Sequence, residues 1–291
     1  MSKVMIMTDT VASVPDELTA RYGIMVVPAA IISFNGSQYI EGRTLNATEA
    51  YNLITKDPDR FVTSPLTPAH LVEEYSQIPA DVTDVLFITI SSGLSAVNKV
   101  ATLAADVYCQ NSPQKRIKIF DSNSCAGGQG MVVLAAARAA EKGMTLERVV
   151  EVAQEARQKT KGLMILDTLR YVYRTGRMSK EDALKAAESN IKPINKIGVN
   201  GTVEFVDAVT KREAGYKRLL ELVSQEATTR SLHFMLSHAA APEMVERFAG
   251  MIKENFDCLS LVVSDYSPVM GYGAGPGCLF VAFHPELDLL K

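Results

Sequence analysis

Hydroxyl side chains gather in a short loop between two apolar segments, and such a loop can bind an anion. The loop covers residues 91–95, with serines at 91, 92 and 95 and a glycine at 93. It follows an apolar, β-branched run and precedes a segment from Ala96 whose apolar residues recur at helical spacing. Serine hydroxyls, unpaired N–H groups and a helix dipole would then point at one place. The same residues are also ordinary turn and cap residues, so the loop alone leaves both interpretations open.

A second pair of hydroxyls, Thr63 and Ser64, lies a few residues before a predicted helix. Thr67 followed by Pro68 is typical of a helix start, because threonine caps the first turn and proline is tolerated at the first helical position. We therefore place Thr63 and Ser64 in the loop just before this helix.

Three segments of the first half have the pattern of buried parallel strands. Segments 4–7 and 85–90 are apolar, segment 116–120 alternates basic and apolar residues, and each is followed by polar residues and then by helical periodicity. Right-handed crossovers would bring the three loops to one edge of the sheet, where open α/β sheets bind ligands. The sequence therefore predicts an α/β fold with a doubly wound parallel sheet in its N-terminal domain. The third loop carries glycines at 127, 128 and 130, but these form no GxGxxG or Walker motif, so a nucleotide site is not expected.

The regular alternation of strand and helix stops near residue 160. A helix over 146–161, ended by Gly162, closes the first domain, which gives domains 1–160 and 161–291. Strands at 163–166 and 232–236, a hairpin about Asn200-Gly201 and helices at 211–226 and 242–255 predict a smaller α+β domain. The glycine-rich segment 271–277 lies between apolar strands. It either exposes backbone N–H groups or forms a tight connection between the strands.

Composition excludes several functional classes. The chain has 291 residues, 47% of them hydrophobic and 22% charged, with a net charge of -3, which favours a globular protein without nucleic-acid partners. The first ten residues carry too few apolar side chains for a signal peptide or a span, so we expect a cytoplasmic protein without stable membrane insertion. The four cysteines and four histidines lack ligand spacing, and we expect no metal, disulfide or cofactor.

Six motifs in one order resemble those of the DegV family, bacterial fatty-acid-binding proteins of which several are acyl-carrying subunits of a fatty acid kinase. The motifs are MTDT in the first strand, TSPLT at 63–67, ISSGLS at 90–95, DS at 121–122, RTGRMS at 174–179 and GAGPG at 273–277. The resemblance spans nearly the whole chain. It implies two domains and a bound fatty acid of about 14 to 18 carbons, whose carboxylate lies at the domain interface and is presented to a partner kinase.

The resemblance also implies roles for individual residues. Thr63 and Ser64 correspond to a pair that binds the carboxylate. Ser92, Gly93 and Ser95 belong to the corresponding serine loop. The remaining implied contacts, with the head group or with a partner, are Arg177, Gly273 and Gly275.

Two departures from the family pattern bear on function. Ala96 and Val97 replace a glycine and a hydroxyl residue that usually follow the serine loop. Gly273 stands where many members carry a histidine, which the resemblance links to phosphoryl transfer. Fatty-acid binding is therefore expected to tolerate these changes better than kinase coupling does.

Two alternatives are weighed against a non-enzymatic fatty-acid carrier. One is a divergent carrier of another amphiphile without kinase coupling. The other is an enzyme, either a small-molecule phosphotransferase or a serine-dependent acyl hydrolase. A hydrolase would require a GxSxG elbow and a histidine base, but the serine loop lacks the first glycine and the histidines fall outside the polar loops.

Overall fold

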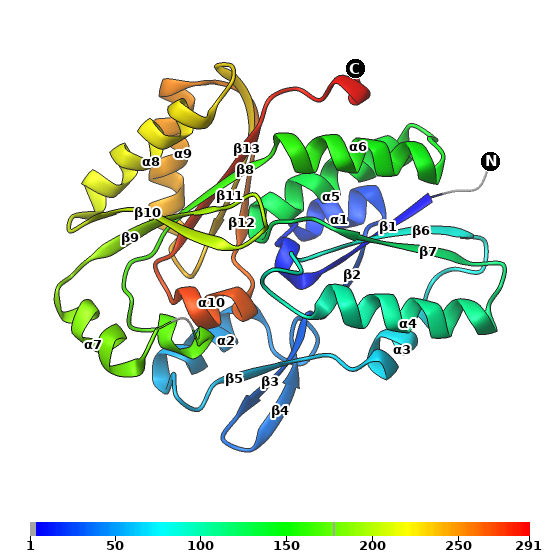
Figure 1. Ribbon diagram of the computed structural model, residues 1–291, viewed down its shortest axis with the longest axis horizontal. Helices are drawn as coiled ribbons and strands as arrows, with labels where there is room; N and C mark the ends of the chain where they lie inside the picture. Colours follow the sequence, from blue (N-terminus) through cyan, green and yellow to red (C-terminus); the bar gives the residue numbers. More distant parts are fainter. Residues whose placement is uncertain (1–3, 177) are drawn as a thin grey trace.

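The computed structural model describes residues 4–176 and 178–291 and contains three β-sheets with helices packed on them (Figure 1). The first is a four-stranded sheet in which all strands are parallel. In spatial order its strands are β2 Met25–Val27, β1 Val4–Asp9, β6 Asp84–Thr89 and β7 Arg116–Asp121. This parallel sheet confirms the predicted fold class.

Helices cover both faces of the parallel sheet, because its central strands are apolar on both sides. Leu86 and Ile88 pack with the helices of one face, whereas Val85 and Phe87 pack with those of the other. The first face carries α1 Asp16–Tyr22, α5 Ala126–Glu141 and α6 Leu146–Lys159. The second face carries α3 Pro68–Ser76 and α4 Val97–Asn111. The sheet is therefore doubly wound.

The second sheet has six strands and is mixed. Only β11 and β12 are parallel neighbours, and the other pairs are antiparallel. In spatial order its strands are β10 Val203–Val209, β9 Lys192–Ile197, β8 Lys161–Ile165, β13 Leu279–His284, β11 Ser231–His238 and β12 Asp257–Asp265. Helices α8 Arg212–Glu226 and α9 Pro242–Asn255 pack on one face of this mixed sheet.

Helix α5 lies between the parallel and mixed sheets, and the prediction that its glycines form a loop is wrong. The helix begins at Ala126 and therefore contains the glycines at 127, 128 and 130. A β-carbon at Gly130 would lie 2.6 Å from the Ala12 carbonyl oxygen and 2.7 Å from the Met235 sulfur. Close packing against the turn that follows β1 and against β11 therefore requires glycine here, which outweighs its low helix propensity.

A third, small antiparallel sheet lies beside the other two. In spatial order its strands are β4 Ser37–Ile40, β3 Ala30–Phe34 and β5 Val62–Pro65. Thr63 and Ser64, predicted in a loop, lie in β5 because that segment pairs with β3. The remaining elements are α2 Ala47–Lys56, α7 Lys180–Glu188, α10 Pro268–Ala274, η1 Thr10–Ala12, η2 Val172–Thr175 and η3 Asp288–Leu290.

Two further glycine predictions are corrected. Gly162 does not end a helix: α6 stops at Lys159, and Gly162 lies in β8, where a β-carbon would be 2.7 Å from the Phe280 ring. Gly271 and Gly273 lie in α10 rather than in a connection between strands.

The division into domains 1–160 and 161–291 stays a prediction. Within residues 4–176 and 178–291, no helix is both long and apolar enough to cross a bilayer.

Candidate functional site

A cavity of about 400 Å³ lies where the parallel, small and mixed sheets meet. This volume is within the usual range for small-molecule sites. The carboxyl ends of β1 and β6, strand β5, and the segment from β12 through α10 all contribute to its wall. The lining residues are Val11, Ala29, Ala30, Thr63, Ser64, Pro65, Ile90, Leu94, Ser95, Ala96, Met164, Leu166, Val172, Thr175, Asn195, Val203, Tyr266, Val269, Met270, Tyr272, Gly273 and Ala274.

Most buried residues of this cavity wall are apolar, and the exceptions are Asn195 and the hydroxyl of Tyr266. Val11 follows β1, Ile90 follows β6, and Met164 and Leu166 come from the β8 region; all four are buried. The positions are apolar because strand ends at the centre of the fold are enclosed on every side. Such a lining suits a hydrocarbon chain, which gains free energy when it leaves water.

Hydroxyl groups line the part of the cavity that is nearer the surface. Thr63 and Ser64 come from β5, Ser95 precedes α4, and Thr175 ends η2. Ser64 is exposed and the other three are half-buried. In the part of the chain that the structure describes, the hydroxyls of Thr63 and Ser64 make no hydrogen bond. They are therefore available as donors to a ligand.

The serine loop contributes only part of its predicted set to this wall. Ser95 lines the cavity, and its Oγ accepts a hydrogen bond from the Val97 N–H at 3.4 Å, at the start of α4. Ser92 and Gly93 do not line it. The Ser92 N–H donates to Asp121 Oδ2 at 3.2 Å, and the Gly93 N–H donates to Ser91 Oγ at 3.1 Å.

The loop that holds Gly93 also packs against the mixed sheet. A β-carbon at Gly93 would lie 2.8 Å from the carbonyl oxygen of Asn200, in the turn between β9 and β10. Nearby, Asn123 Nδ2 donates to the Val199 carbonyl oxygen at 2.6 Å. The glycine of this loop therefore permits contact between the two large sheets.

Helix α10 forms a wall of the cavity with Val269, Met270, Gly273 and Ala274. A β-carbon at Gly273 would lie 2.4 Å from the Thr175 methyl carbon, so the Thr175 side chain already fills that space. Gly275 ends α10 against the Tyr171 ring and does not line the cavity. Arg177 lies outside the described residues. The contacts predicted for Arg177, Gly273 and Gly275 stay predictions.

Three polar wall residues were missed by sequence reasoning: Thr175, Asn195 and Tyr266. The Tyr266 hydroxyl is buried and has no hydrogen-bond partner among the residues that the structure describes, and burial raises its pKa well above the ordinary value. Asn195 could have been noticed as a polar amide within an apolar strand pattern. Thr175 lies within the RTGRMS motif, but that motif gave it no role, and nothing in the local sequence marks Tyr266; only the fold brings both residues to the cavity.

No lysine or arginine lines the cavity among the described residues. Arg174, next to Thr175, places its guanidinium carbon 5.2 Å from the Tyr171 ring centre and 4.4 Å from that of Tyr272. It donates to the Pro58 carbonyl oxygen at 2.7 Å, and burial lowers its pKa. Arg174 therefore stabilises the packing of η2 against α10.

Two carboxyl groups are buried behind the cavity wall. Asp9 accepts hydrogen bonds from the Ile90 N–H at 2.8 Å and from Gln129 Nε2 at 3.1 Å. Burial raises the pKa of Asp9 to about 6. Burial also raises the pKa of Glu41, although several donors stabilise its charged form. Both groups are absent from this lining and border a separate cavity of about 400 Å³, whose wall also includes Thr10 and Arg43.

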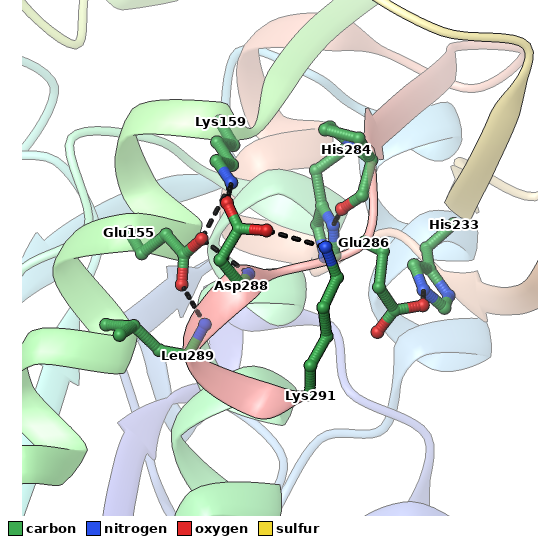
Figure 2. Close-up of polar contacts among 9 residues, drawn as sticks. Glu155, Lys159, His233, His284, Glu286, Asp288, Leu289 and Lys291 are labelled. Carbon is green, nitrogen blue, oxygen red and sulfur yellow. Dashed lines mark hydrogen bonds and ion pairs between the residues drawn. The ribbon is translucent and has the colours of Figure 1, made fainter.

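The histidines do not supply a base to the cavity serines. None of His70, His233, His238 and His284 lines the cavity. Figure 2 shows His233 beside Glu286, and His233 Nδ1 also lies 2.7 Å from the Ser260 hydroxyl. This cluster borders a separate space of only about 20 Å³. The geometry therefore gives no support to a serine hydrolase site.

This chain is similar to known proteins over nearly its whole length. The model of the DegV family, described as an uncharacterised protein family, matches residues 3–286. A DegV domain-containing protein from Caldanaerobacter subterraneus is 27% identical over 98% of this chain and 100% of its own.

Solved structures share the fold at lower identity. A DegV family protein from Eubacterium eligens, loaded with heptadecanoic acid, has a TM-score of 0.86 at 19% identity, and the match covers 97% of this chain and 100% of that one. The Streptococcus pneumoniae fatty acid kinase (Fak) B3 protein, loaded with linoleic acid, has a TM-score of 0.86 at 17% identity, with 98% and 100% covered.

Proposed function

Because this chain belongs to the DegV family, we propose that it binds a long-chain fatty acid of about 14 to 18 carbons in the cavity at the meeting of the three sheets. The observation that carries the proposal is the change from hydroxyl groups near the surface to buried apolar side chains inside. A fatty acid has the same polarity order. Each buried methylene contributes about 0.8 kcal/mol, so an acyl chain can offset the free-energy cost of association.

The carboxylate end is held by Thr63, Ser64 and Ser95 in this proposal. Their hydroxyls can donate charge-assisted hydrogen bonds, and the N-terminus of α4 adds a favourable dipole. A carboxylate leaving water requires such donors, because no lysine or arginine among the described residues lines the cavity. For Ser92 and Gly93 a direct contact stays a prediction from the sequence.

The carboxylate assignment predicts a loss of affinity on removing the hydroxyls. The double substitution Thr63→Ala and Ser95→Ala should weaken fatty-acid binding by about a hundredfold or more, because each lost charge-assisted hydrogen bond costs about 1.5 kcal/mol or more. Thr228→Ala is the matched control and should bind like wild type, because this exposed threonine does not line the cavity. Displacement of a fluorescent fatty acid gives both constants. An unchanged affinity in the double variant would contradict the assignment.

The proposed role is that of a binding protein that presents the carboxylate to a partner kinase in the cytoplasm, without catalysing the transfer itself. The Streptococcus pneumoniae Fak B3 protein carries the name of a fatty acid kinase, which supports the proposed kinase partner. Among the described residues, no histidine lines the cavity beside its serines, which supports a role without catalysis. A carrier of another amphiphile without kinase coupling is the second candidate. Gly273, in the place of a histidine, favours that candidate, because a glycine offers no side chain to orient or charge a head group.

Native mass spectrometry of the purified protein, followed by extraction of any bound lipid, tests the proposal most directly. We expect a mass increment equal to one long-chain fatty acid. Delipidated protein should take up palmitate in a displacement assay. A protein that is isolated empty and binds no fatty acid of about 14 to 18 carbons would refute the proposal. Adding the catalytic subunit of a fatty acid kinase with ATP and magnesium then separates simple carriage from kinase coupling.

A further inference from the structure

Glu41 joins three parts of the fold through one buried carboxylate. It follows β4 and is only 1% exposed. Its Oε1 accepts a hydrogen bond from the Ser267 hydroxyl at 2.6 Å and from the Val269 N–H at 3.1 Å. Its Oε2 accepts a hydrogen bond from the Thr10 hydroxyl. The donors therefore come from η1 and from the start of α10, which are far apart in the sequence.

These donors belong to segments that form the cavity wall. Val269 itself lines the cavity, and Thr10 precedes Val11, which also lines it. The Thr10 hydroxyl oxygen accepts a hydrogen bond from the N–H of Ala29, another wall residue, at 3.0 Å. The Glu41 carboxylate is thus one hydrogen bond away from the Thr10 and Val269 segments and, through Thr10, two from Ala29, although Glu41 does not line the cavity.

Helix α10 depends on Glu41 for part of its capping. Ser267 is the N-cap residue of α10, but its side chain makes no capping hydrogen bond to the helix and donates to Glu41 instead. The Glu41 carboxylate accepts the Val269 N–H in its place. A carboxylate at this end also interacts favourably with the helix dipole. Figure 1 shows α10 between the mixed sheet and α2. Because residues of α10 line the cavity, a shift of this helix would change the cavity shape.

Glu155 provides a comparison within the same molecule. It too is a carboxylate that accepts N–H groups at the start of a short helix, from Asp288 at 2.7 Å and Leu289 at 2.9 Å (Figure 2). Glu155 is paired with Lys159 at 2.7 Å. Glu41 has no lysine, arginine or histidine partner among the described residues, and it is held by neutral donors only. A carboxylate that is buried without a cation lowers the stability of the folded state. Its retention at this position therefore indicates a specific role for Glu41.

We propose that Glu41 is a positioning residue for the fatty-acid cavity: it holds α10 against η1 and the Ala29 segment so that the wall keeps the shape that binds the acyl chain. This inference rests on the proposed function and names a residue outside the cavity that sets its affinity. The carboxylate acts by fixing Val269 and Thr10. It does not touch the ligand.

The test compares Glu41→Ala, Glu41→Gln and Ser267→Ala with Glu155→Ala as the matched control. Palmitate affinity is measured by displacement on delipidated, folded protein, and amide hydrogen exchange is followed at the start of α10. Glu41→Ala should weaken palmitate binding by about tenfold and speed exchange at Val269, because its N–H loses its acceptor. Glu41→Gln should stay within about threefold of wild type, since the amide oxygen can still accept from Ser267 and Val269.

The controls separate positioning from a general loss of stability. Glu155→Ala should lower the free energy of unfolding while leaving palmitate affinity within about twofold of wild type. Wild-type affinity in folded Glu41→Ala would overturn the proposal. If Glu41→Ala does not fold, Ser267→Ala decides the question: affinity about threefold weaker supports it, and unchanged affinity overturns it.

Failure of the proposed function would be visible separately. In that case the wild-type protein itself would bind no palmitate, whatever the variants do. The exchange measurement needs no ligand, so it still tests whether Glu41 holds α10. Unchanged Val269 exchange in a folded Glu41→Ala would overturn the positioning role on its own, because that variant removes the acceptor of the Val269 N–H.

Discussion

Gly273 and Thr175 are matched in size at the cavity wall. Only a glycine at 273 leaves room for the Thr175 methyl group, which would otherwise lie 2.4 Å from a β-carbon. Gly273→Ala alone should therefore displace η2 or α10 and weaken palmitate binding by roughly tenfold. Adding Thr175→Ala removes the methyl group, leaves the Thr175 β-carbon 3.9 Å away, and should restore binding. The two affinities, measured by displacement, check this; equal losses in the single and double variants would contradict it.

The close contact between Gly273 and Thr175 also affects a substitution that introduces, at position 273, the histidine of many family members. A Gly273→His substitution in the native background combines a new functional group with a steric conflict at Thr175. We therefore expect the Gly273→His, Thr175→Ala variant to support phosphorylation by the kinase better than Gly273→His alone. Comparing the double variant with Thr175→Ala alone separates the imidazole from the packing change.

Asp9 should make the stability of the protein depend on pH. Its pKa in the folded protein is raised to about 6 from an ordinary value of 3.8, mainly by burial, and the neighbouring Glu41 charge acts in the same direction. The folded state therefore binds this proton more tightly than the unfolded state. The contribution is fully favourable below about pH 4 and is lost as pH rises through about 6.

Urea unfolding measures this effect. Between pH 4 and pH 7 the contribution of Asp9 to the unfolding free energy should fall by roughly 1 to 3 kcal/mol. Asp9→Asn removes the titrating group, so the variant should show a smaller fall over the same interval. Parallel pH profiles for wild type and variant would show that Asp9 is not responsible.

At the scale of the element, α5 depends on close contact with two sheets. Gly130→Ala would place a methyl group 2.6 Å from the Ala12 carbonyl oxygen and 2.7 Å from the Met235 sulfur. We expect a loss of roughly 1 to 3 kcal/mol in unfolding free energy. Gly250 in α9 is the control, because nothing lies within 4 Å of its β-carbon position.

Gly250→Ala should be neutral or stabilising by up to about 1 kcal/mol, since alanine has the higher helix propensity. Thermal or urea unfolding of the two variants under one condition gives the comparison. Similar losses in both would show that helix propensity, rather than contact with Ala12 and Met235, decides the effect at Gly130.

At the scale of the whole molecule, the cavity wall comes from all three sheets, so a ligand there should stabilise the entire fold. A fatty acid at about one hundred times its Kd stabilises the folded state by about 2.7 kcal/mol, which corresponds to a rise in Tm of roughly 5 to 10 °C. Delipidated protein should show this rise with palmitate in scanning calorimetry. Thr63→Ala with Ser95→Ala should need a higher palmitate concentration for the same shift. A Tm that does not respond to palmitate would contradict binding at the interface.

The sequence alone determined the local features of this protein. Apolar runs identified β1 and β6, the two central strands of the parallel sheet, because strands buried on both faces are mostly apolar. Thr67 and Pro68 identified the start of α3, since N-cap and first-turn preferences depend only on neighbouring backbone groups. Ordered motifs identified the family.

Tertiary structure alone decided the rest. The glycines of α5 and α10 are typical of loops in the sequence, yet they lie in helices because packing partners far along the chain leave no space for a β-carbon. Thr63 lies in a strand because β3 pairs with it. Glu41 carries no motif, and its role follows from donors more than 200 residues away, at Ser267 and Val269. Local sequence sets backbone propensity, whereas close approach and burial arise only when distant segments meet, so the cavity and the carboxylate behind its wall could not be predicted before the fold was known.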